Sequence, residues 1–399
     1  MGPFLSRGAG EGKYAPARTR QTALRLPVDM ASERILLELR SVSKSFGSTT
    51  VLEGINLAVR DGEFITILGP SGSGKTTILR MIGGFVAPTS GEIRLEGRDI
   101  AAVPINRRPF NTVFQDYALF PHMSVAGNVG YGLMVRGGRR REIARRVGEA
   151  LELMQLSAFA SRYPAELSGG QRQRVALARA IICEPRLILL DEPLAALDVE
   201  LRKQMQLFLK DIQRRIRTTF LFVTHDQEEA IAVADRICVM NFGRILQLGT
   251  PSEVYYRPQS EFVARFFGDN NLIEGVLGSG DGCRRRIETA VGPILCALDG
   301  QPELAAAPAG QRAFAVFRPE SVQAGDVAEA HSAENKASGA VAAVTFAGAT
   351  TVAVVDLDGR AGPVTARIKM PSRVGGAAIA PGDRLSIAWP AAACRMVLG

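Results

Sequence analysis

The sequence predicts an α/β domain over residues 34–268, followed by a small all-β barrel over residues 269–399. Short apolar runs alternate with helical patterns up to Gly268, as in folds whose strands and helices share one core. A glycine-rich turn, GPSGSGKT, joins one of these runs to a helical pattern. After Gly268 the chain becomes rich in Ala, Gly and Val, with short alternating runs such as RLSIAW, which is typical of small barrels.

The composition indicates a globular chain of a reducing compartment. The chain has 399 residues, 46% of them apolar, and a formal net charge of +8. Basic and acidic residues balance over residues 270–399, so the basic excess lies before them. The five cysteines are odd in number and form no C-x-x-C pair, which argues against a disulfide framework or a zinc site. The longest uncharged stretch, residues 337–355, predicts two strands meeting at Gly348 rather than a membrane span.

Individual elements follow along the chain. Residues 1–33 are rich in Gly, Pro, Ala and Arg and predict a disordered basic arm. The ordered pattern ASERILLELRSV directly follows Met30, so Met30 is an alternative start and the arm would lie upstream of it. Thr250 and Pro251 are expected to begin a short helix as N-cap and first residue. Strands are expected at ILLELR, INLAVR, EFITIL and EIRLEG (35–98), at RLILLD (186–191), at TFLFVT (219–224) and in a hairpin turning at 241–243, with helices over 139–183.

The turn GPSGSGKT follows the apolar run EFITIL and precedes the helical pattern TTILRMIGG. Strand, glycine-rich loop and helix in this order predict a phosphate-binding P-loop, against the alternative of a chance glycine-rich turn. Lys75 is expected to reach the β- and γ-phosphates, and the Thr76 hydroxyl to ligate Mg²⁺. The predicted nucleotide-binding residues here are Gly69, Pro70, Ser71, Gly72, Ser73, Gly74, Lys75, Thr76 and Thr77.

Polar residues end the two buried strands. Asp191 ends LILLD and is suited to hold Mg²⁺, while Glu192 beside it is the candidate general base that polarises the attacking water. The alternative for this pair is two solvated carboxylates at a strand end. His225 ends FVTHD at the expected ligand edge of the sheet, where it is either structural or in contact with the γ-phosphate. Gln115, at the end of the apolar run in TVFQDY, carries no signal by itself.

The stretch LSGGQRQRVA predicts a helix that starts with two glycines. Ser168 and Gln171 have the spacing of a capping box, so Ser168 is the expected N-cap. Gly169 and Gly170 each weaken a helix by about 1 kcal/mol relative to alanine. A helix N-terminus with free N–H groups can bind an anion, and glycine would allow that anion to approach. The alternative is a capped helix start and nothing more.

With these residues in hand, the chain resembles the ATP-binding subunit of an ABC transporter over about residues 35–268. The resemblance implies a P-loop NTPase fold of the ABC ATPase type, with a mixed sheet and a helical subdomain over about 116–185. It also implies ATP and Mg²⁺ as cofactors. The matching motifs are the Walker A loop (69–76), the Q-loop Gln115, the LSGGQ signature (167–171), the Walker B strand (187–192), the D-loop ending at Asp198, the switch His225, and Phe46 where the family stacks an aromatic on adenine.

The resemblance assigns roles that the residues alone do not. Lys75, Gln115, Glu192 and His225 would be catalytic, and Thr76, Gln115 and Asp191 would hold the metal. Two subunits would dimerise head to tail, with the signature residues of one closing on the γ-phosphate bound by the other. Two departures from the family pattern are Ala195, where serine is common, and Gly127, where an acid is usual. The signature residues are Ser168, Gly169, Gly170 and Gln171.

The tail resembles the OB-like TOBE domain of importer ATPases through FRPESV, residues 317–322. This implies two transmembrane permease subunits and a periplasmic or extracellular solute-binding protein as partners, and a place on the cytoplasmic face of the cell (inner) membrane. FNTVFQDYALFPHMSV is most similar to the spermidine/putrescine branch, with ferric-ion, sugar and phosphonate importers as alternatives. A soluble, non-transport ABC ATPase is disfavoured because the chain has one module and no long coiled coil. No nucleic-acid partner is expected.

Overall fold

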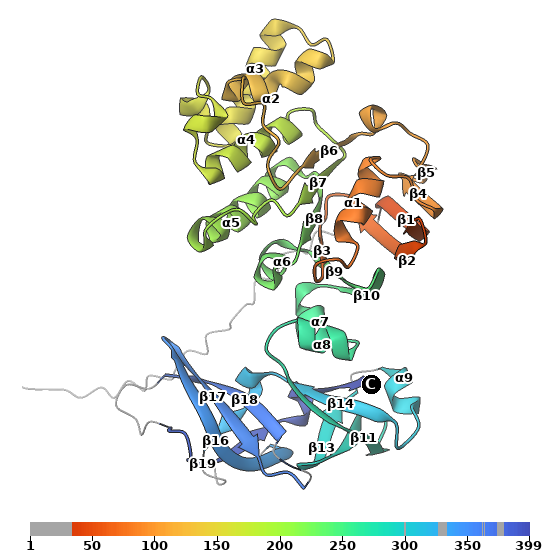
Figure 1. The fold of residues 1–399 in the computed structure, drawn as a ribbon, viewed down its shortest axis with the longest axis vertical. Helices are drawn as coiled ribbons and strands as arrows, with labels where there is room; N and C mark the ends of the chain where they lie inside the picture. The colour runs from red at the N-terminus through yellow and green to blue at the C-terminus, as the bar shows by residue number, and fades with distance from the viewer. Residues whose placement is uncertain (1–33, 299–300, 326–332, 361, 363, 373–378) are drawn as a thin grey trace, which may run out of the picture.

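The computed structural model describes residues 34–298, 301–325, 333–360, 362, 364–372 and 379–399. The arm expected over residues 1–33 lies outside these ranges. An α/β part and an all-β part follow one another along the longest axis of the molecule, with α7 (Pro251–Tyr256) and α8 (Glu261–Phe266) between them (Figure 1). In the part that the structure describes, no helix is both long enough and apolar enough to span a membrane.

Two sheets build the α/β part. The antiparallel sheet has the order β2-β1-β4-β5 and the larger, six-stranded sheet the order β10-β9-β3-β8-β7-β6. Helix α1 (Lys75–Gly83) shares its buried apolar residues with both sheets, so it forms the core between them. The strands are β1 (Ile35–Phe46), β2 (Thr49–Arg60), β3 (Phe64–Leu68), β4 (Ser90–Leu95), β5 (Arg98–Asp99), β6 (Phe110–Val113), β7 (Leu187–Asp191), β8 (Thr219–Thr224), β9 (Arg236–Asn241) and β10 (Arg244–Gly249).

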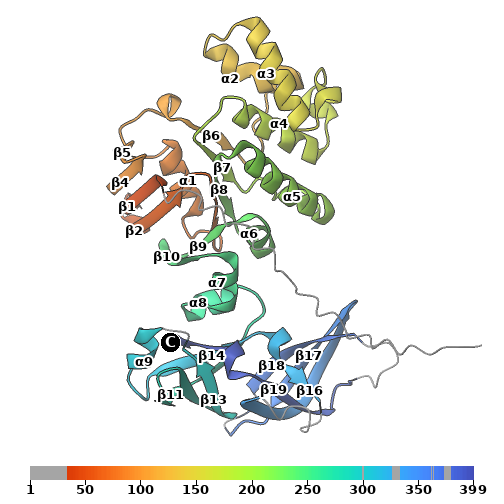
Figure 2. The ribbon, with the colours of Figure 1, turned by 180° about the vertical axis from the view of Figure 1, so that it is seen from behind.

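A helical region covers the other face of the large sheet. Its core joins apolar residues of these helices to Phe64, Phe220 and Phe222 of the sheet. Figures 1 and 2 show α2 and α3 at the end of the molecule farthest from the all-β part. The helices are α2 (Val125–Val135), α3 (Arg140–Leu153), α4 (Gly169–Ile181), α5 (Val199–Ile216) and α6 (Gln227–Val233). Helices were expected over 139–183; the boundaries proposed for the domains stay predictions.

The large sheet places the predicted site residues along one edge. Strands β6, β7, β8 and β3 are parallel neighbours, and the register pairs Val113 with Leu190, Asp191 with Val223, and Leu68 with Thr224. The carboxyl ends of all four strands therefore meet at the same edge, which is where ligands bind in open α/β sheets. Gln115, Glu192, His225 and the glycine-rich turn each follow one of these ends.

The FRPESV motif lies at the junction between the two parts. Arg318 is 4% exposed, and its guanidinium donates hydrogen bonds to the carbonyls of Phe267, at 2.9 Å, and Tyr255. The guanidinium also stacks on the Tyr255 ring, 3.4 Å from its centroid, and burial lowers the pKa of Arg318. Through Arg318, the motif thus connects the all-β part to α7 and to the end of α8 by hydrogen bonds and ring stacking. Helix α7 has Thr250 as its N-cap, as predicted.

Two five-stranded antiparallel sheets form the all-β part, in the orders β13-β12-β11-β14-β20 and β15-β19-β16-β17-β18. One apolar core joins them, in which Trp389 stacks on Phe317 at 4.3 Å between ring centroids. The predicted pair of strands around Gly348 is present as β16 and β17. The elements are β11 (Asn271–Gly280), β12 (Arg284–Thr289), β13 (Gly292–Ala297), α9 (Pro302–Ala306), β14 (Arg312–Phe317), β15 (Gln323–Ala324), β16 (Asn335–Ala347), β17 (Thr350–Leu357), β18 (Val364–Pro371), β19 (Arg384–Trp389) and β20 (Cys394–Leu398).

The first of these sheets curls until its outermost strands meet. Cys296 on β13 and Cys394 on β20 are buried free thiols whose Sγ atoms are 3.3 Å apart. The Asn335 side chain pairs with the outer edge of β13, because its Oδ1 accepts from the Leu295 N–H at 2.7 Å and its Nδ2 donates to the Leu295 carbonyl at 2.9 Å. The sheet therefore comes close to a closed barrel.

Candidate nucleotide site

The glycine-rich turn between β3 and α1 has the backbone of a phosphate-binding loop. Gly74 is the N-cap of α1 at φ 100°, and a Cβ there would lie 2.4 Å from Leu52 Cδ2, so only glycine fits this close approach of β2. The Lys75 ammonium points back into the turn and donates to the carbonyls of Gly69 at 2.9 Å and Pro70 at 3.0 Å. Burial lowers the pKa of Lys75, and the Glu192 and Asp191 carboxylates oppose this shift.

Two oxygen groups suited to Mg²⁺ meet beside this turn. The Thr76 hydroxyl donates to Asp191 Oδ1 at 3.2 Å, which joins the first turn of α1 to the end of β7. Burial raises the pKa of Asp191, and the Thr76 hydrogen bond opposes that shift. The buried hydroxyl of Ser73 has no partner among the described residues. Hydroxyl and carboxylate oxygens are the ligands Mg²⁺ prefers, and the unpaired hydroxyl suits a phosphate oxygen, so these residues fit Mg²⁺-ATP.

Glu192 and His225 lie in contact at the same edge. His225 Nδ1 is 3.1 Å from Glu192 Oε2, and the Glu192 N–H donates to the Val223 carbonyl at 3.0 Å. Glu192 has φ 45°, a left-handed backbone that disfavours an L-residue by roughly 1–2 kcal/mol. Such strain concentrates at functional sites. In this arrangement the His225 imidazole can orient the Glu192 carboxylate at the ligand edge of the sheet.

Gln115 and Phe46 lie at the margins of the site. Gln115 is exposed in the turn after β6, and among the described residues no hydrogen bond joins it to Thr76 or Asp191. Phe46, at the end of β1, is 51% exposed, with the Lys44 ammonium 4.8 Å from its ring centroid. The register of β6 places Gln115 at the same edge of the sheet as the glycine-rich turn, and Phe46 ends the strand that pairs with β2, whose Leu52 contacts Gly74.

The predicted capping box at the start of α4 is present. Ser168 Oγ accepts from the Gln171 N–H at 3.3 Å, and Gln171 Oε1 accepts from the Ser168 N–H at 2.9 Å. The glycines have a cause within the chain, because a Cβ on Gly170 would lie 2.9 Å from Leu201 Cδ1. A Cβ on Gly169 would similarly lie 3.2 Å from a methyl of Leu197. A side chain at either glycine would therefore force Leu197 or Leu201 to shift, so packing within the chain also favours glycine here.

Arg202 is a site residue that sequence reasoning missed. Its guanidinium donates to the Leu197 carbonyl at 3.0 Å and to Asp226 Oδ2 at 3.3 Å. Asp226 follows His225 and is the N-cap of α6, while Asp198, which follows Leu197, caps α5 through the Leu201 N–H at 2.9 Å. Arg202 thus joins the predicted D-loop to the predicted switch. The only sequence signal is its position four residues after Asp198, which is uninformative without the fold.

Comparison with known proteins agrees with this geometry. Residues 52–195 match the family model described as "ABC transporter", and residues 315–397 the one described as "TOBE domain". The chain is 46% identical to the spermidine/putrescine import ATP-binding protein PotA of Rubrobacter xylanophilus over 92% of this chain and 94% of that protein. The chain belongs to the ABC transporter ATP-binding proteins.

Two further relatives agree with this assignment. A Pseudomonas aeruginosa protein with the same spermidine/putrescine name is 46% identical over 81% of this chain and 88% of its own length. Among solved structures, CbiO1 of Clostridium perfringens, described as part of the ABC transporter complex CbiONQ, aligns with a TM-score of 0.53 and 30% identity. The alignment covers 58% of this chain and 94% of CbiO1. The predictions of an ABC ATPase fold with a TOBE domain, and of an ATP-hydrolysing enzyme, are confirmed.

The contact between Gly170 and Leu201 predicts the outcome of an alanine substitution in this ABC ATPase. Gly170→Ala should destabilise the protein by about 1–3 kcal/mol and lower ATPase activity, because the new Cβ overpacks against Leu201. Adding Leu201→Ala should restore both, since it removes the methyl groups that clash. Thermal unfolding and ATP hydrolysis of the two single variants and the double variant test this. A stable but inactive double variant would show that glycine is required for the nucleotide itself.

The half-buried Asp191 predicts opposite effects on stability and on metal binding. Its pKa is raised, so the folded protein holds the proton more tightly than the unfolded chain and this stabilisation is lost as the pH rises through that pKa. Asp191→Asn keeps an acceptor for Thr76 and removes the buried charge. At pH 7 we expect the nucleotide-free variant to have a Tm at or above that of the wild type. The extra rise in Tm that Mg²⁺ gives in the presence of ATP should disappear. Retention of that rise would contradict the metal role of Asp191.

Proposed function

We propose that this chain is the ATP-hydrolysing subunit of an importer for polyamines, spermidine or putrescine. The single observation that carries the proposal is the likeness to import proteins of that name over nine-tenths of the chain, including the tail. Ferric-ion, sugar and phosphonate importers are the alternatives. A soluble, non-transport ABC ATPase would instead purify with ribosomes or nucleic acid and not with membrane subunits.

Nucleotide binding would use the strand ends described above. The residues of the glycine-rich turn, from Gly69 to Thr77, would surround the phosphates, with backbone N–H donors from those other than Pro70, and the Lys75 ammonium would turn from its carbonyl partners towards the β- and γ-phosphates. Thr76, Asp191 and Gln115 would hold Mg²⁺, which when bound neutralises charge on the phosphates. The exposed ring of Phe46 would stack on adenine.

Hydrolysis would depend on the contact between Glu192 and His225. Glu192 would accept a proton from the attacking water, which makes the water oxygen a better nucleophile towards the γ-phosphorus. His225 would hold Glu192 Oε2 in place through Nδ1 and present its other ring nitrogen to the γ-phosphate. Lys75 would stabilise the negative charge that develops there.

A second copy of the chain would complete the site. Among the described residues, no hydrogen bond joins Ser168 or Gln171 to the chain's own glycine-rich turn. In a head-to-tail dimer the N-terminal end of α4, with Ser168, Gly169, Gly170 and Gln171, would close on the γ-phosphate bound by the partner subunit, and Asp198 would lie at the seam. Ala195, in the turn before Asp198, brings no hydroxyl to that seam.

An apolar groove on the helical region is the candidate contact with the permease subunits. Helices α2 and α3 enclose a cavity of about 700 Å³, lined by Met134, Ile143 and Val147 among others. Gly127 contributes to its wall without a side chain, where the family usually has an acid. A cytoplasmic segment of a permease would dock there, so that two ATPase subunits would take one permease each. This contact would hold the subunit at the cytoplasmic face of the cell membrane, and the permeases would connect it to the solute-binding protein outside.

Substrate identity is tested by uptake in cells that lack this chain. Labelled putrescine, spermidine, ferric ion and maltose are offered separately, with the wild-type chain or a Lys75→Ala variant supplied from a plasmid. We expect polyamine uptake alone to be lost, and to return only with the wild-type chain. Unchanged polyamine uptake with loss of another solute would reject the polyamine assignment and leave the ATPase in place.

Glu192 is tested by removing only its ability to accept a proton. Glu192→Gln should keep ATP affinity and lose hydrolysis by about 10²–10⁴-fold, so that an ATP-bound dimer accumulates. Nucleotide binding, phosphate release and size-exclusion chromatography with ATP measure the three effects. The matched control is Glu149→Gln on α3, an exposed carboxylate that pairs with Arg145 and should keep the wild-type rate. Normal turnover in Glu192→Gln would remove Glu192 from the mechanism.

A further inference from the structure

The turn that follows Gln115 has a backbone conformation that its own residues disfavour. Tyr117 has φ 62° and Ala118 has φ 44°, so two consecutive residues with side chains adopt the left-handed region. Left-handed backbone is unfavourable for any residue with a Cβ, and glycine is absent from this turn. The conformation must therefore be held by contacts from outside the turn.

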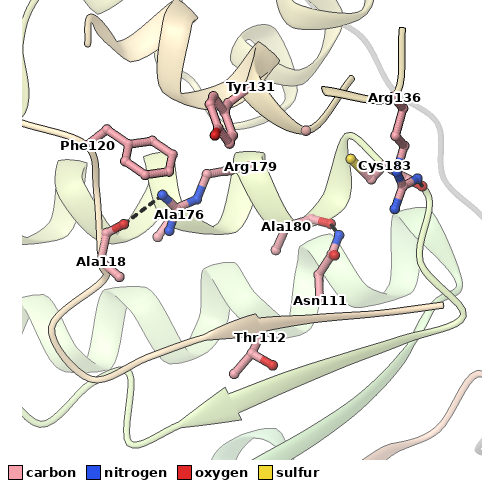
Figure 3. A pocket seen from close by; sticks show the side chains of 11 residues that line it. Asn111, Thr112, Ala118, Phe120, Tyr131, Arg136, Ala176, Arg179, Ala180 and Cys183 are labelled. Atoms are coloured by element: carbon pink, nitrogen blue, oxygen red, sulfur yellow. Dashed lines mark hydrogen bonds between the residues drawn. The ribbon is translucent and has the colours of Figure 1, made fainter. Parts of the chain in front are cut away.

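Arg179 on α4 supplies those contacts. Its Nη1 donates to the Ala118 carbonyl at 2.7 Å and its Nη2 donates to the Tyr117 carbonyl at 2.9 Å, so both left-handed residues are held by one guanidinium. Figure 3 shows Arg179 reaching from its helix to Ala118 across a pocket of about 400 Å³, with Phe120 beside it. The guanidinium lies 5.4 Å from the centroid of the Phe120 ring. A planar fork with two parallel donors is a geometry that arginine provides and lysine does not.

Backbone carbonyls, rather than carboxylates, are the partners that the described residues offer the Arg179 guanidinium. Among the described residues, no carboxylate forms an ion pair with it, and burial lowers its pKa. A half-buried charge needs hydrogen bonds to offset its loss of water, and the two backbone carbonyls provide them. The contact is therefore a specific one between α4 and this turn, rather than an incidental surface pair.

The far end of the same loop is fixed by a different helix. Asn128 of α2 is fully buried; its Oδ1 accepts from the Phe120 N–H at 2.8 Å, and its Nδ2 donates to the carbonyls of Phe120, Met123 and Ser124 at 3.0–3.1 Å. Asn128 thus holds residues 120–124, while Arg179 makes the hydrogen bonds that the described residues show between α4 and the backbone of Tyr117 and Ala118. The buried Tyr117 side chain also packs in the core to which α4 contributes, so loss of Arg179 would free the backbone nearest Gln115 without removing the turn from the core.

We propose that Arg179 is a positioning residue that holds the 115–118 turn so that Gln115 is presented to the nucleotide-bound Mg²⁺, and that it ties this turn to the signature helix. The inference rests on the proposed function, because it takes Gln115 as a metal ligand. Helix α4 carries both Ser168, at its N-terminal end, and Arg179, three turns later. A rigid helix transmits a displacement of one end to the other. Engagement of the partner subunit's nucleotide at Ser168 therefore moves, through Arg179, the turn that carries Gln115.

The test is the Mg²⁺ dependence of ATP hydrolysis by the complete transporter. Arg179→Met keeps the apolar stem and removes the donors, and it should raise the Mg²⁺ concentration for half-maximal activity about tenfold, as loss of a group that orients a metal ligand does. The activity of Arg179→Met at saturating Mg²⁺ should stay within about threefold of that of the wild type. The Mg²⁺ concentration for half-maximal activity of Arg179→Lys should lie between those of the wild type and Arg179→Met. The matched control is Arg145→Met on α3, whose exposed pairs with Glu142 and Glu149 contribute little.

Relief of the backbone strain provides a second test. Glycine adopts the left-handed region freely, so Ala118→Gly should keep the turn in place with less help from Arg179. In the Ala118→Gly background, Arg179→Met should therefore shift the Mg²⁺ dependence less than about threefold, against about tenfold in the parent chain. A purely structural role for Arg179 would lower Tm in both backgrounds and leave the Mg²⁺ dependence unchanged, which would overturn the proposal.

Controls separate this inference from the proposed function. If Lys75→Ala and Glu192→Gln abolish hydrolysis while Arg179→Met has the Mg²⁺ dependence of the wild type, the positioning role is wrong and the nucleotide site stands. If Lys75→Ala also hydrolyses ATP normally, the proposed site itself is wrong. If Arg179→Met shifts the Mg²⁺ dependence equally with and without Ala118→Gly, the backbone strain of the 115–118 turn has no part in the effect, and the proposal is wrong on that point.

Discussion

The alignment of four parallel strands, two of them buried along their whole length, is the constraint on which this molecule depends. Both faces of β3 and β8 pack against other elements, so a one-residue slip would exchange the two sets of packed side chains and is strongly disfavoured. The fixed register brings the ends of β3, β6, β7 and β8 to one edge. The hydrogen bond between Thr76 and Asp191, and the contact between Glu192 and His225, exist only because separate strands end at the same level.

Much of this arrangement could be predicted from the sequence because its signals are local. Apolar runs, a glycine-rich turn and a capping box each depend on a few adjacent residues, so β7, β8 and the start of α4 follow from them. The remaining features depend on residues far apart in the chain. The left-handed φ of Glu192, the contact of Gly170 with Leu201, and the fork of Arg179 on the 115–118 turn require the folded structure. The sequence attributes the glycines of the signature to an approaching anion, and the folded structure adds a second reason, because Leu197 and Leu201 crowd the same positions.

Two arginines on neighbouring helices join loops that the sequence places far apart. Arg202 connects the segment before Asp198 to the segment after His225, and Arg179 connects α4 to the turn after Gln115. Arg179 uses backbone carbonyls at both of its contacts, so it responds to the conformation of the turn, whereas Arg202 joins the Leu197 carbonyl to the Asp226 carboxylate. Each arginine therefore couples two segments that lie far apart in the sequence through direct hydrogen bonds.

The curled sheet of the TOBE domain has a consequence for the behaviour of the protein in a crowded solution. An outermost strand normally offers unpaired N–H and C=O groups to which strands of other molecules can add, the first step towards aggregation. Here β13 and β20 approach each other at Cys296 and Cys394, and the amide of Asn335 occupies the backbone groups of Leu295. The domain thus covers this edge with one side-chain amide and two thiols, and Pro293 of the same strand removes a further N–H that another strand could pair with.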